Sequence, residues 1–180
     1  MDEYIFNLAG IESFHKKTNS RLRFWFNHIR KNALKKDGDI FEFGVYRGAS
    51  LLAAALILKE LNSKKIIYGF DTFSGFPNYS QYDELNNFYK YKNIFFNTNF
   101  IKKFESFKKN KKFFSNQKKL DIKSISSSGD FKENSLNLLK KKIKFFKLDN
   151  VKIVKGPFSK TINKFFKNYN KKISSANIDC

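Results

Sequence analysis

The chain has 180 residues and a formal net charge of +20 at pH 7, a length sufficient for one domain with a substantial core. Its 36 basic residues include only four arginines, the side chains that bind phosphates and bases in forked pairs, so the charge does not predict specific nucleic-acid binding. A single cysteine excludes an intrachain disulfide and a cysteine-based zinc site. The lack of a signal-peptide core and of an apolar run of ~20 residues predicts a cytoplasmic protein without a membrane span.

Residues 1–37 are predicted to form an N-terminal helical segment. From Glu12 to about Leu34, apolar residues recur at helical spacing in the stripe Leu22, Phe26, Ile29 and Ala33. Such a helix would pack on a sheet or cover a cofactor. His15 and His28 have no acid or cysteine at ligand spacing and are interpreted as surface or packing residues.

The next part of the chain has the order strand, glycine turn, helix, strand and acid. The pieces are the strand Ile40–Phe43, the turn Gly44–Gly48, the apolar helix Ala49–Leu61 and the strand Lys65–Phe70, which ends at Asp71. This order is typical of the first half of a doubly wound nucleotide-binding sheet. Glycines let the backbone approach a ligand because they lack a Cβ. An acid at the end of the second strand is placed to accept hydrogen bonds from ribose hydroxyls.

The turn reads Glu-x-Gly-x-x-x-Gly, from Glu42 to Gly48, where a dinucleotide site has Gly-x-Gly-x-x-Gly. A carboxylate at the start of the loop would repel a phosphate but suits an ammonium or a sulfonium. S-adenosylmethionine carries both of these cations, together with a ribose and no phosphate. Residues 38–77 are therefore predicted to bind S-adenosylmethionine. A glycine turn in an ordinary α/β protein is the alternative.

Residues 78–128 are rich in Phe, Tyr, Lys and Asn and show no clean periodicity over most of their length. Three interpretations stay open. The segment is a mobile lid or substrate wall, an aromatic and basic surface for sugars or single-stranded nucleic acid, or an insertion of helix and loop that reflects compositional bias.

Residues 129–180 are predicted to supply two more strands, Val151–Val154 and Ile173–Ile178, each preceded by an amphipathic helix. The first helix lies within Phe131–Lys147 and has the stripe Leu136, Leu139, Ile143 and Phe146. The second is expected to be capped by Ser159 and has the stripe Ile162, Phe165, Phe166 and Tyr169. Both stripes are interpreted as core.

Several of these pieces resemble the macrocin O-methyltransferase (TylF-type) family of class I methyltransferases. The matching segments are FEFGVYRGAS (41–50), YGFDTFSGFP (68–77), GDF (129–131), VKIVKGPFSKTI (151–162) and the terminal ANIDC (176–180). One departure is that Lys160 precedes Thr161 where the family has Asp-Thr. The resemblance implies a Rossmann-like class I methyltransferase fold. It also implies methylation of a hydroxyl, often on a sugar or glycosylated metabolite, with S-adenosylmethionine and a divalent metal such as Mg²⁺.

The loop after the first strand is expected to hold the methionine part of the cofactor. Gly44, Tyr46 and Gly48 would shape the loop, and Glu42 would favour the cationic end of the ligand. Ser50 either hydrogen-bonds the ligand or caps the following helix, and both roles stay open.

A second group of residues is expected beside the nucleoside. Asp71 is the candidate ribose acceptor, and Thr72 and Phe73 would pack on the nucleoside. Gly156 and Phe158 follow the third strand, where enzymes of the resembled family hold the adenine.

Asp179 is the candidate both for catalysis and for metal binding. It ends the strand expected beside the first one, where doubly wound sheets present catalytic groups. In the resembled family an aspartate here helps hold Mg²⁺, with further acids supplied later in the chain. Only four of the fold's strands can be placed, so the doubly wound sheet is expected to be truncated after the fourth strand. The exposed edge would then promote homo-oligomers.

The predicted activity is therefore methyl transfer to a small-molecule or glycosyl acceptor. Two alternatives remain: a methyltransferase fold with another acceptor or no activity, and a basic module that binds polyanions. Salt separates the last alternative, because polyanion affinity falls steeply as salt is added.

Overall fold

The computed structural model describes residues 3–17, 19–35, 37–76, 98–114 and 135–179. The chain divides into two compact units, Met1–Phe73 with Asn134–Cys180, and Ser74–Glu133. The described part of the second unit includes the basic helix α5 (Thr98–Phe114), with an ion pair of 3.2 Å between Lys108 Nζ and Glu105 Oε2. Most of the predicted segment 78–128 lies outside the described residues, so its three interpretations stay predictions.

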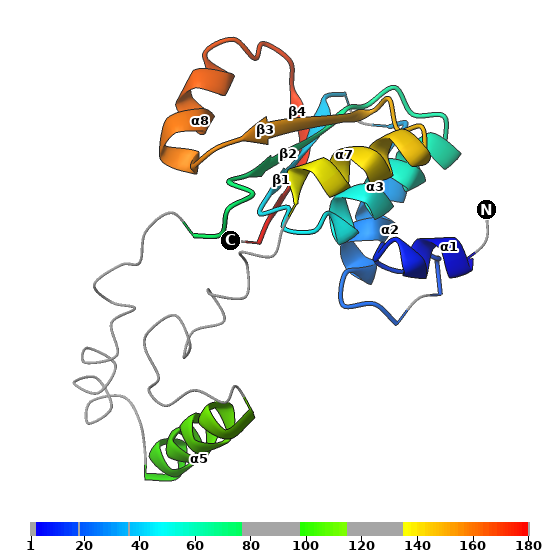
Figure 1. Cartoon of the computed structure of the whole chain (residues 1–180). Coiled ribbons are helices and arrows are strands. Elements are labelled where there is room, and N and C mark those ends of the chain that lie inside the picture. Colours follow the sequence, from blue (N-terminus) through cyan, green and yellow to red (C-terminus); the bar gives the residue numbers. More distant parts are fainter. Residues whose placement is uncertain (1–2, 18, 36, 77–97, 115–134, 180) are drawn as a thin grey trace. The chain divides into compact units, whose positions relative to one another are not determined.

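The first unit is built on four parallel strands in the order β3-β2-β1-β4 (Figure 1). They are β1 (Asp39–Phe43), β2 (Ile67–Asp71), β3 (Val151–Lys155) and β4 (Ile173–Ile178). All four predicted strands are present, and β4 pairs with β1 as expected. The order reverses around β1, as in Rossmann-like sheets in general.

One face of the sheet carries the main core. Its centre is α3 (Ala49–Glu60), in which every residue from Leu51 to Leu58 is buried. A helix that is apolar on all sides needs neighbours all round. Three helices share this core with α3: α1 (Glu3–Leu8), α2 (Arg23–Asn32) and α7 (Leu136–Phe145).

The opposite face is covered by α8 (Phe158–Phe166) and is largely aromatic. The sheet contributes Phe41, Tyr68 and Phe70, and the helix and the turn after it contribute Phe165, Phe166 and Tyr169. Rings here pack at centroid distances such as 5.1 Å between Phe70 and Phe165. Helices therefore lie on both faces of a parallel sheet, as predicted, and both predicted apolar stripes are core.

The prediction of one helix from Glu12 to Leu34 is wrong in its first half. The short helix α1 ends at Leu8, Gly10 adopts φ +63° in the turn that follows, and the chain then runs irregularly until α2 begins at Arg23. The Ser20 hydroxyl accepts from Leu22 N–H and donates to Glu12, which gives the irregular segment hydrogen bonds of its own. Such local side-chain bonds compete with helix formation.

The prediction of a Ser159 cap is also wrong. Helix α8 begins at Phe158 with Pro157 as its N-cap, two residues before the predicted cap, and no side chain caps its first turn. The fixed φ of proline suits a helix start, so the ring sets the boundary that the serine was expected to set.

Among the described strands, β4 pairs only with β1 and forms one edge of the sheet. Its last residue, Ile178, is 72% exposed. Association through this edge stays a prediction. No helix in the described part of the chain is long and apolar enough to cross a membrane.

Candidate functional site

Three acidic residues from three strands lie along the carboxyl edge of the sheet. Glu42 is in β1, Asp71 ends β2, and Asp179 directly follows β4. Parallel strands bring their carboxyl ends to one edge, where ligands of doubly wound sheets bind. Asp71 and Asp179 are therefore at the strand ends where the sequence predicted them.

Glu42 has no exposed surface, although its side chain is a carboxylic acid. Its Oε1 accepts a hydrogen bond of 2.6 Å from the Ser50 hydroxyl. Its Oε2 is buried and has no partner within hydrogen-bond geometry among the residues that the structure describes, although the Asn177 side chain is near enough to lower the pKa of the carboxyl. A buried polar atom without a partner is costly, so this oxygen is a position where a donor would be strongly favoured.

The protonation of Glu42 is set by its surroundings. Burial raises the pKa of Glu42 to about 7, the Ser50 and Asn177 side chains lower it, and the charge of Asp179 raises it. The carboxyl therefore changes charge near neutral pH, where a cationic ligand would favour the ionised form. Ser50 does not cap α3, whose N-cap is Gly48.

The loop between β1 and α3 has an unusual backbone. Gly44, Tyr46 and Gly48 all adopt positive φ, at 91°, 53° and 81°. At Gly48 a Cβ would lie 2.4 Å from Leu139 Cδ1 on α7, so a side chain there would also clash. Of these three residues Tyr46 is the unusual one, because residues other than glycine seldom adopt positive φ.

A further glycine, Gly69, lies opposite Glu42 in the neighbouring strand. A Cβ at this position would lie 2.8 Å from Val45 Cγ2 and 3.0 Å from Leu51 Cδ2. The missing side chain therefore lets the loop and α3 come close to β2. Sequence reasoning did not single out Gly69, although a glycine inside a strand signals such a close approach.

The carboxylate of Asp71 accepts three backbone hydrogen bonds. Oδ2 accepts from the N–H groups of Val45 and Tyr46 at 2.9 and 2.8 Å, and Oδ1 accepts from Phe73 N–H at 2.7 Å. The side chain thus joins the loop after β1 to the loop after β2. The predicted ribose contact is untested by these bonds and stays a prediction.

The other residues predicted beside the nucleoside lie close to this carboxylate or in the aromatic cluster. Thr72 and buried Phe73 follow Asp71 directly, and Gly156 N–H donates to the Asp71 carbonyl at 2.9 Å. Phe158 packs edge-on against Phe43 at 5.9 Å, on the face that α8 covers. Gly156 therefore lies beside Asp71 at the candidate site, whereas the described contact of Phe158 is within the core.

Asp179 is placed by a backbone bond, since its N–H donates to the Phe43 carbonyl at 2.9 Å. Its carboxylate is 61% exposed and lies 3.8 Å from the Arg21 guanidinium. Sequence reasoning missed Arg21 because it belongs to the irregular segment that was expected to be helical. It also missed Asn177, which lies opposite Glu42 in β4.

The acids of this edge do not form a magnesium site by themselves. No group of three His, Cys, Asp or Glu side chains comes together in the described ranges. Mg²⁺ prefers several oxygen ligands in octahedral geometry, and Asp179 has Arg21 as its nearest described charge partner. The described residues do not fit the metal, and Mg²⁺ stays a prediction from the resemblance.

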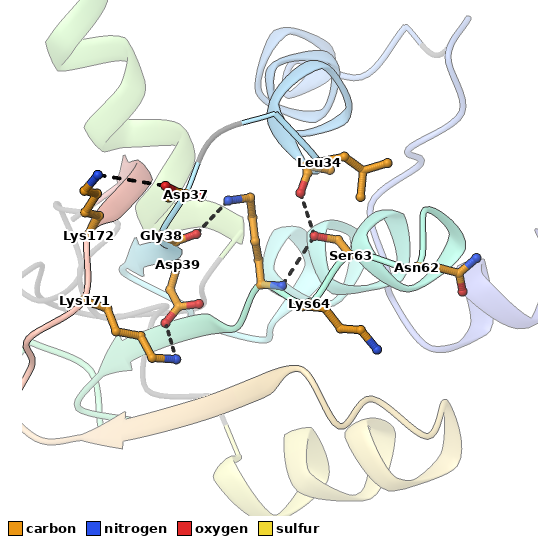
Figure 2. A pocket seen from close by; sticks show the side chains of 11 residues that line it. Leu34, Asp37, Gly38, Asp39, Asn62, Ser63, Lys64, Lys171 and Lys172 are labelled. Atoms are coloured by element: carbon orange, nitrogen blue, oxygen red, sulfur yellow. Dashed lines mark hydrogen bonds and ion pairs between the residues drawn. The ribbon is translucent and has the colours of Figure 1, made fainter.

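A hollow of about 550 Å³ lies at the opposite, amino end of the sheet (Figure 2). It is lined by the lysines Lys64, Lys65, Lys171 and Lys172 and by the acids Asp37 and Asp39. The ends of α2 and α3 also line it, and helix C-termini carry partial negative charge. The lysines thus balance two carboxylates and two helix ends, so the hollow is not a clear anion site.

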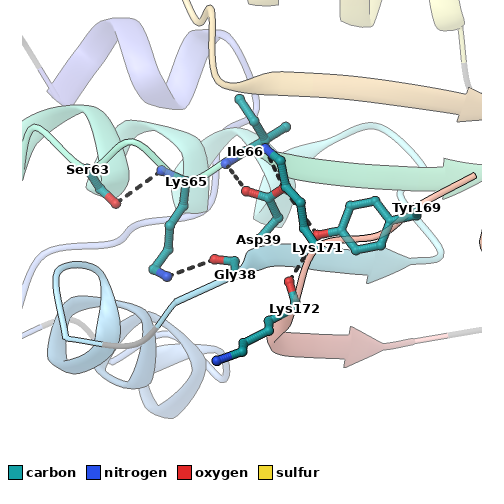
Figure 3. A network of polar contacts seen from close by, with 8 residues as sticks. All are labelled: Gly38, Asp39, Ser63, Lys65, Ile66, Tyr169, Lys171 and Lys172. Carbon is teal, nitrogen blue, oxygen red and sulfur yellow. Dashed lines mark hydrogen bonds and ion pairs between the residues drawn. The ribbon is translucent and has the colours of Figure 1, made fainter.

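Asp39 is the centre of a contact network at this end (Figure 3). Its carboxylate accepts from Ile66 N–H at 2.9 Å and from the Tyr169 hydroxyl at 3.1 Å, and lies 3.6 Å from Lys171 Nζ. Burial, followed by the nearby Asp39 carboxylate, raises the pKa of Tyr169, so its hydroxyl stays protonated and donates. The Asp39 carboxylate therefore has hydrogen bonds and an ion pair from the protein's own groups.

The fold and this edge are thus α/β and Rossmann-like in general, with a buried acid beside a glycine loop. No protein-family model matches the chain, and no curated protein matches it significantly.

Proposed function

We propose that the protein is an S-adenosylmethionine-dependent O-methyltransferase that acts on a hydroxyl of a small-molecule or glycosyl acceptor. The observation that carries the proposal is the buried Glu42, with one oxygen unpartnered among the described residues beside a glycine loop. A carboxylate in that place favours a cation and disfavours a phosphate. S-adenosylmethionine fits this requirement better than a dinucleotide does.

The cofactor would supply a methyl group on a sulfonium when bound. Glu42 Oε2 would accept a hydrogen bond from its ammonium group, while Ser50 keeps Oε1 occupied at 2.6 Å. The backbone of the loop at Gly44 and Gly48 leaves room for close approach, because neither residue has a Cβ. These residues would bind and orient the cofactor, and none of them would take part in the transfer.

A hydroxyl that accepts a methyl group has to lose its proton. Asp179 is the acid placed for this at the end of β4, where 61% of its side chain is exposed to an incoming acceptor. Its Oδ2 would take the proton, in the role of a general base. The guanidinium of the neighbouring Arg21 lies 3.8 Å from this oxygen.

Calorimetric titration of the 180-residue chain with S-adenosylmethionine, methylthioadenosine and ATP tests the proposal. We expect S-adenosylmethionine to bind best, because methylthioadenosine lacks both cations and ATP brings phosphates to Glu42. The Glu42→Gln variant should lose roughly ten- to a hundredfold in affinity for S-adenosylmethionine, the range for a hydrogen bond to a charged group. Its affinity for methylthioadenosine should change little.

Glu60→Gln is the matched control, because it removes the same charge at the far end of α3, where Glu60 is exposed. It should leave all three affinities unchanged. Added salt gives a second arm: adenosyl-ligand binding should hardly respond. A preference for ATP, together with affinity that falls steeply with salt, would favour the polyanion-binding alternative instead.

A further inference from the structure

We propose that Asp71 is a positioning residue that fixes both loops of the site in their ligand-binding form, and that it does not itself hold the ribose. This inference rests on the proposed function and names how one residue of that site acts.

The bonds to Asp71 come from two loops that are distant in sequence. Val45 and Tyr46 belong to the loop after β1, and Phe73 belongs to the loop after β2. All three donor–acceptor distances lie between 2.7 and 2.9 Å, the range of charge-assisted bonds. One carboxylate therefore holds the two loops at a fixed separation.

Two of the three donors have a strained backbone. Tyr46 has φ 53° and Phe73 has φ 54°, both in the left-handed region although neither residue is glycine. Such conformations are unfavourable and persist only where the surrounding structure stabilises them. The bond from each strained N–H to Asp71 supplies that stabilisation.

The carboxylate has little capacity left for a ribose. A carboxylate offers about four acceptor positions, and three are taken by backbone N–H groups. Binding both hydroxyls of a ribose would therefore displace at least one of these three backbone N–H groups. These bonds therefore favour a role for Asp71 in ordering the two loops over a role in contacting the ribose.

Amide hydrogen exchange on the ligand-free chain tests the clamp directly. In Asp71→Asn, exchange at Tyr46 and Phe73 should accelerate on the order of ten- to a hundredfold, since charged hydrogen bonds are lost. The control is Asp39→Asn, which removes the buried carboxylate that holds Ile66 N–H at the other end of the sheet. It should accelerate Ile66 and leave Tyr46 and Phe73 unchanged. Unchanged exchange at these two residues in Asp71→Asn would overturn the proposal.

A measurement on the wild-type chain covers the case in which Asp71→Asn does not fold. The amides of Val45, Tyr46 and Phe73 share one acceptor group, so one opening event should release all three and their protection factors in hydrogen exchange should be alike. Widely different protection factors would overturn the clamp.

Adenosine and 3′-deoxyadenosine distinguish a clamp from a ribose contact. Removal of the hydroxyl should weaken binding by the same factor in the wild type and in Asp71→Asn, and Asp71→Asn should weaken both nucleosides ten- to a hundredfold. A hydroxyl effect present only in the wild type would assign Asp71 to the ribose. If neither nucleoside nor S-adenosylmethionine binds, the proposed function fails, while the exchange experiment still decides the clamp.

Discussion

The two ends of the sheet each contain an acid whose carboxylate accepts hydrogen bonds from the backbone, but they differ in what surrounds it. At the amino end, Asp39 is satisfied by Ile66, Tyr169 and Lys171. At the carboxyl end, Asp71 holds two left-handed residues, and the neighbouring Glu42 has an oxygen without a described partner. The Asp39 carboxylate is therefore paired with groups of the protein. The carboxyl end has strained backbone and, among the described residues, a buried oxygen without a hydrogen-bond partner.

The difference indicates that the amino end of the sheet contributes to stability and that the carboxyl end is the place for ligand binding. Strained backbone and unpaired buried polar atoms reduce stability, and they occur where function requires them. Substitutions at the amino end should therefore act on the free energy of unfolding. Substitutions at the carboxyl end should act mainly on ligand affinity.

The largest effect is expected for Gly44→Val at the carboxyl end. A branched side chain would be placed at φ 91° in the loop where a ligand is expected to approach. Calorimetry should detect no binding of S-adenosylmethionine, while circular dichroism keeps its helical signal. Gly10→Val is the control, because Gly10 also has positive φ, and its nearest group, Lys142 Nζ, is 3.9 Å from the Cβ position. Normal binding by Gly44→Val would show that the loop is not the site.

Gly38→Ala should be the most destabilising change at the amino end. Its Cβ would lie 2.3 Å from the Lys172 carbonyl oxygen, at a φ of 97°, and backbone cannot easily move away. We expect a loss of about 3 kcal/mol in the free energy of unfolding, measured in urea. The folded fraction should still bind the cofactor. A loss of affinity without a loss of stability would reverse the proposed division between the two ends.

The pH dependence of stability should reveal Glu42. Because its pKa is raised from 4.5 to about 7 in the folded chain, the folded state binds more protons than the unfolded state between these values. The free energy of unfolding should therefore fall as pH rises from 4.5 through 7, by at most about 3 kcal/mol. Glu42→Gln should remove this fall. An unchanged pH profile in the variant would assign the titration to other groups.

The smallest effect is expected for Tyr169→Phe. The hydroxyl donates to Asp39 Oδ2 at 3.1 Å and lies 3.0 Å from the Lys172 carbonyl, at a partly exposed position. Its loss should lower the free energy of unfolding by about 1 kcal/mol and leave ligand affinity unchanged. A change in ligand affinity would mean that the two ends of the sheet are coupled.

The sequence was sufficient to predict most elements of the first unit. Apolar periodicity located all four strands, and the stripes of α7 and α8 identified their buried faces, because burial repeats with the period of the element. The position of β4 beside β1 was also predicted. The prediction of a helix in the N-terminal segment failed because Ile11 and Phe14 are buried although their backbone is irregular, and periodicity carries no information there.

The location of the candidate site could be predicted from the sequence, but the hydrogen bonds within it could not. Glu42 and Asp71 follow from their places in the strand and loop pattern. The bonds to Asp71 depend on left-handed backbone at Tyr46 and Phe73, and neither residue type signals that conformation. The Arg21–Asp179 contact joins positions far apart in the chain, which no local pattern reveals.

The single tryptophan gives the first unit an optical probe of one interface. Trp25 on α2 lies nearly parallel to His28 at 6.2 Å, and His28 Nε2 is 2.8 Å from the Ser175 hydroxyl on β4. The aromatic cluster under α8 contains only Phe and Tyr, so emission excited at the red edge of the tryptophan band comes from Trp25 alone. Its fluorescence should therefore report the separation of α2 from the edge strand. Near-ultraviolet dichroism, to which the Phe and Tyr rings also contribute, would follow the packing of the opposite face.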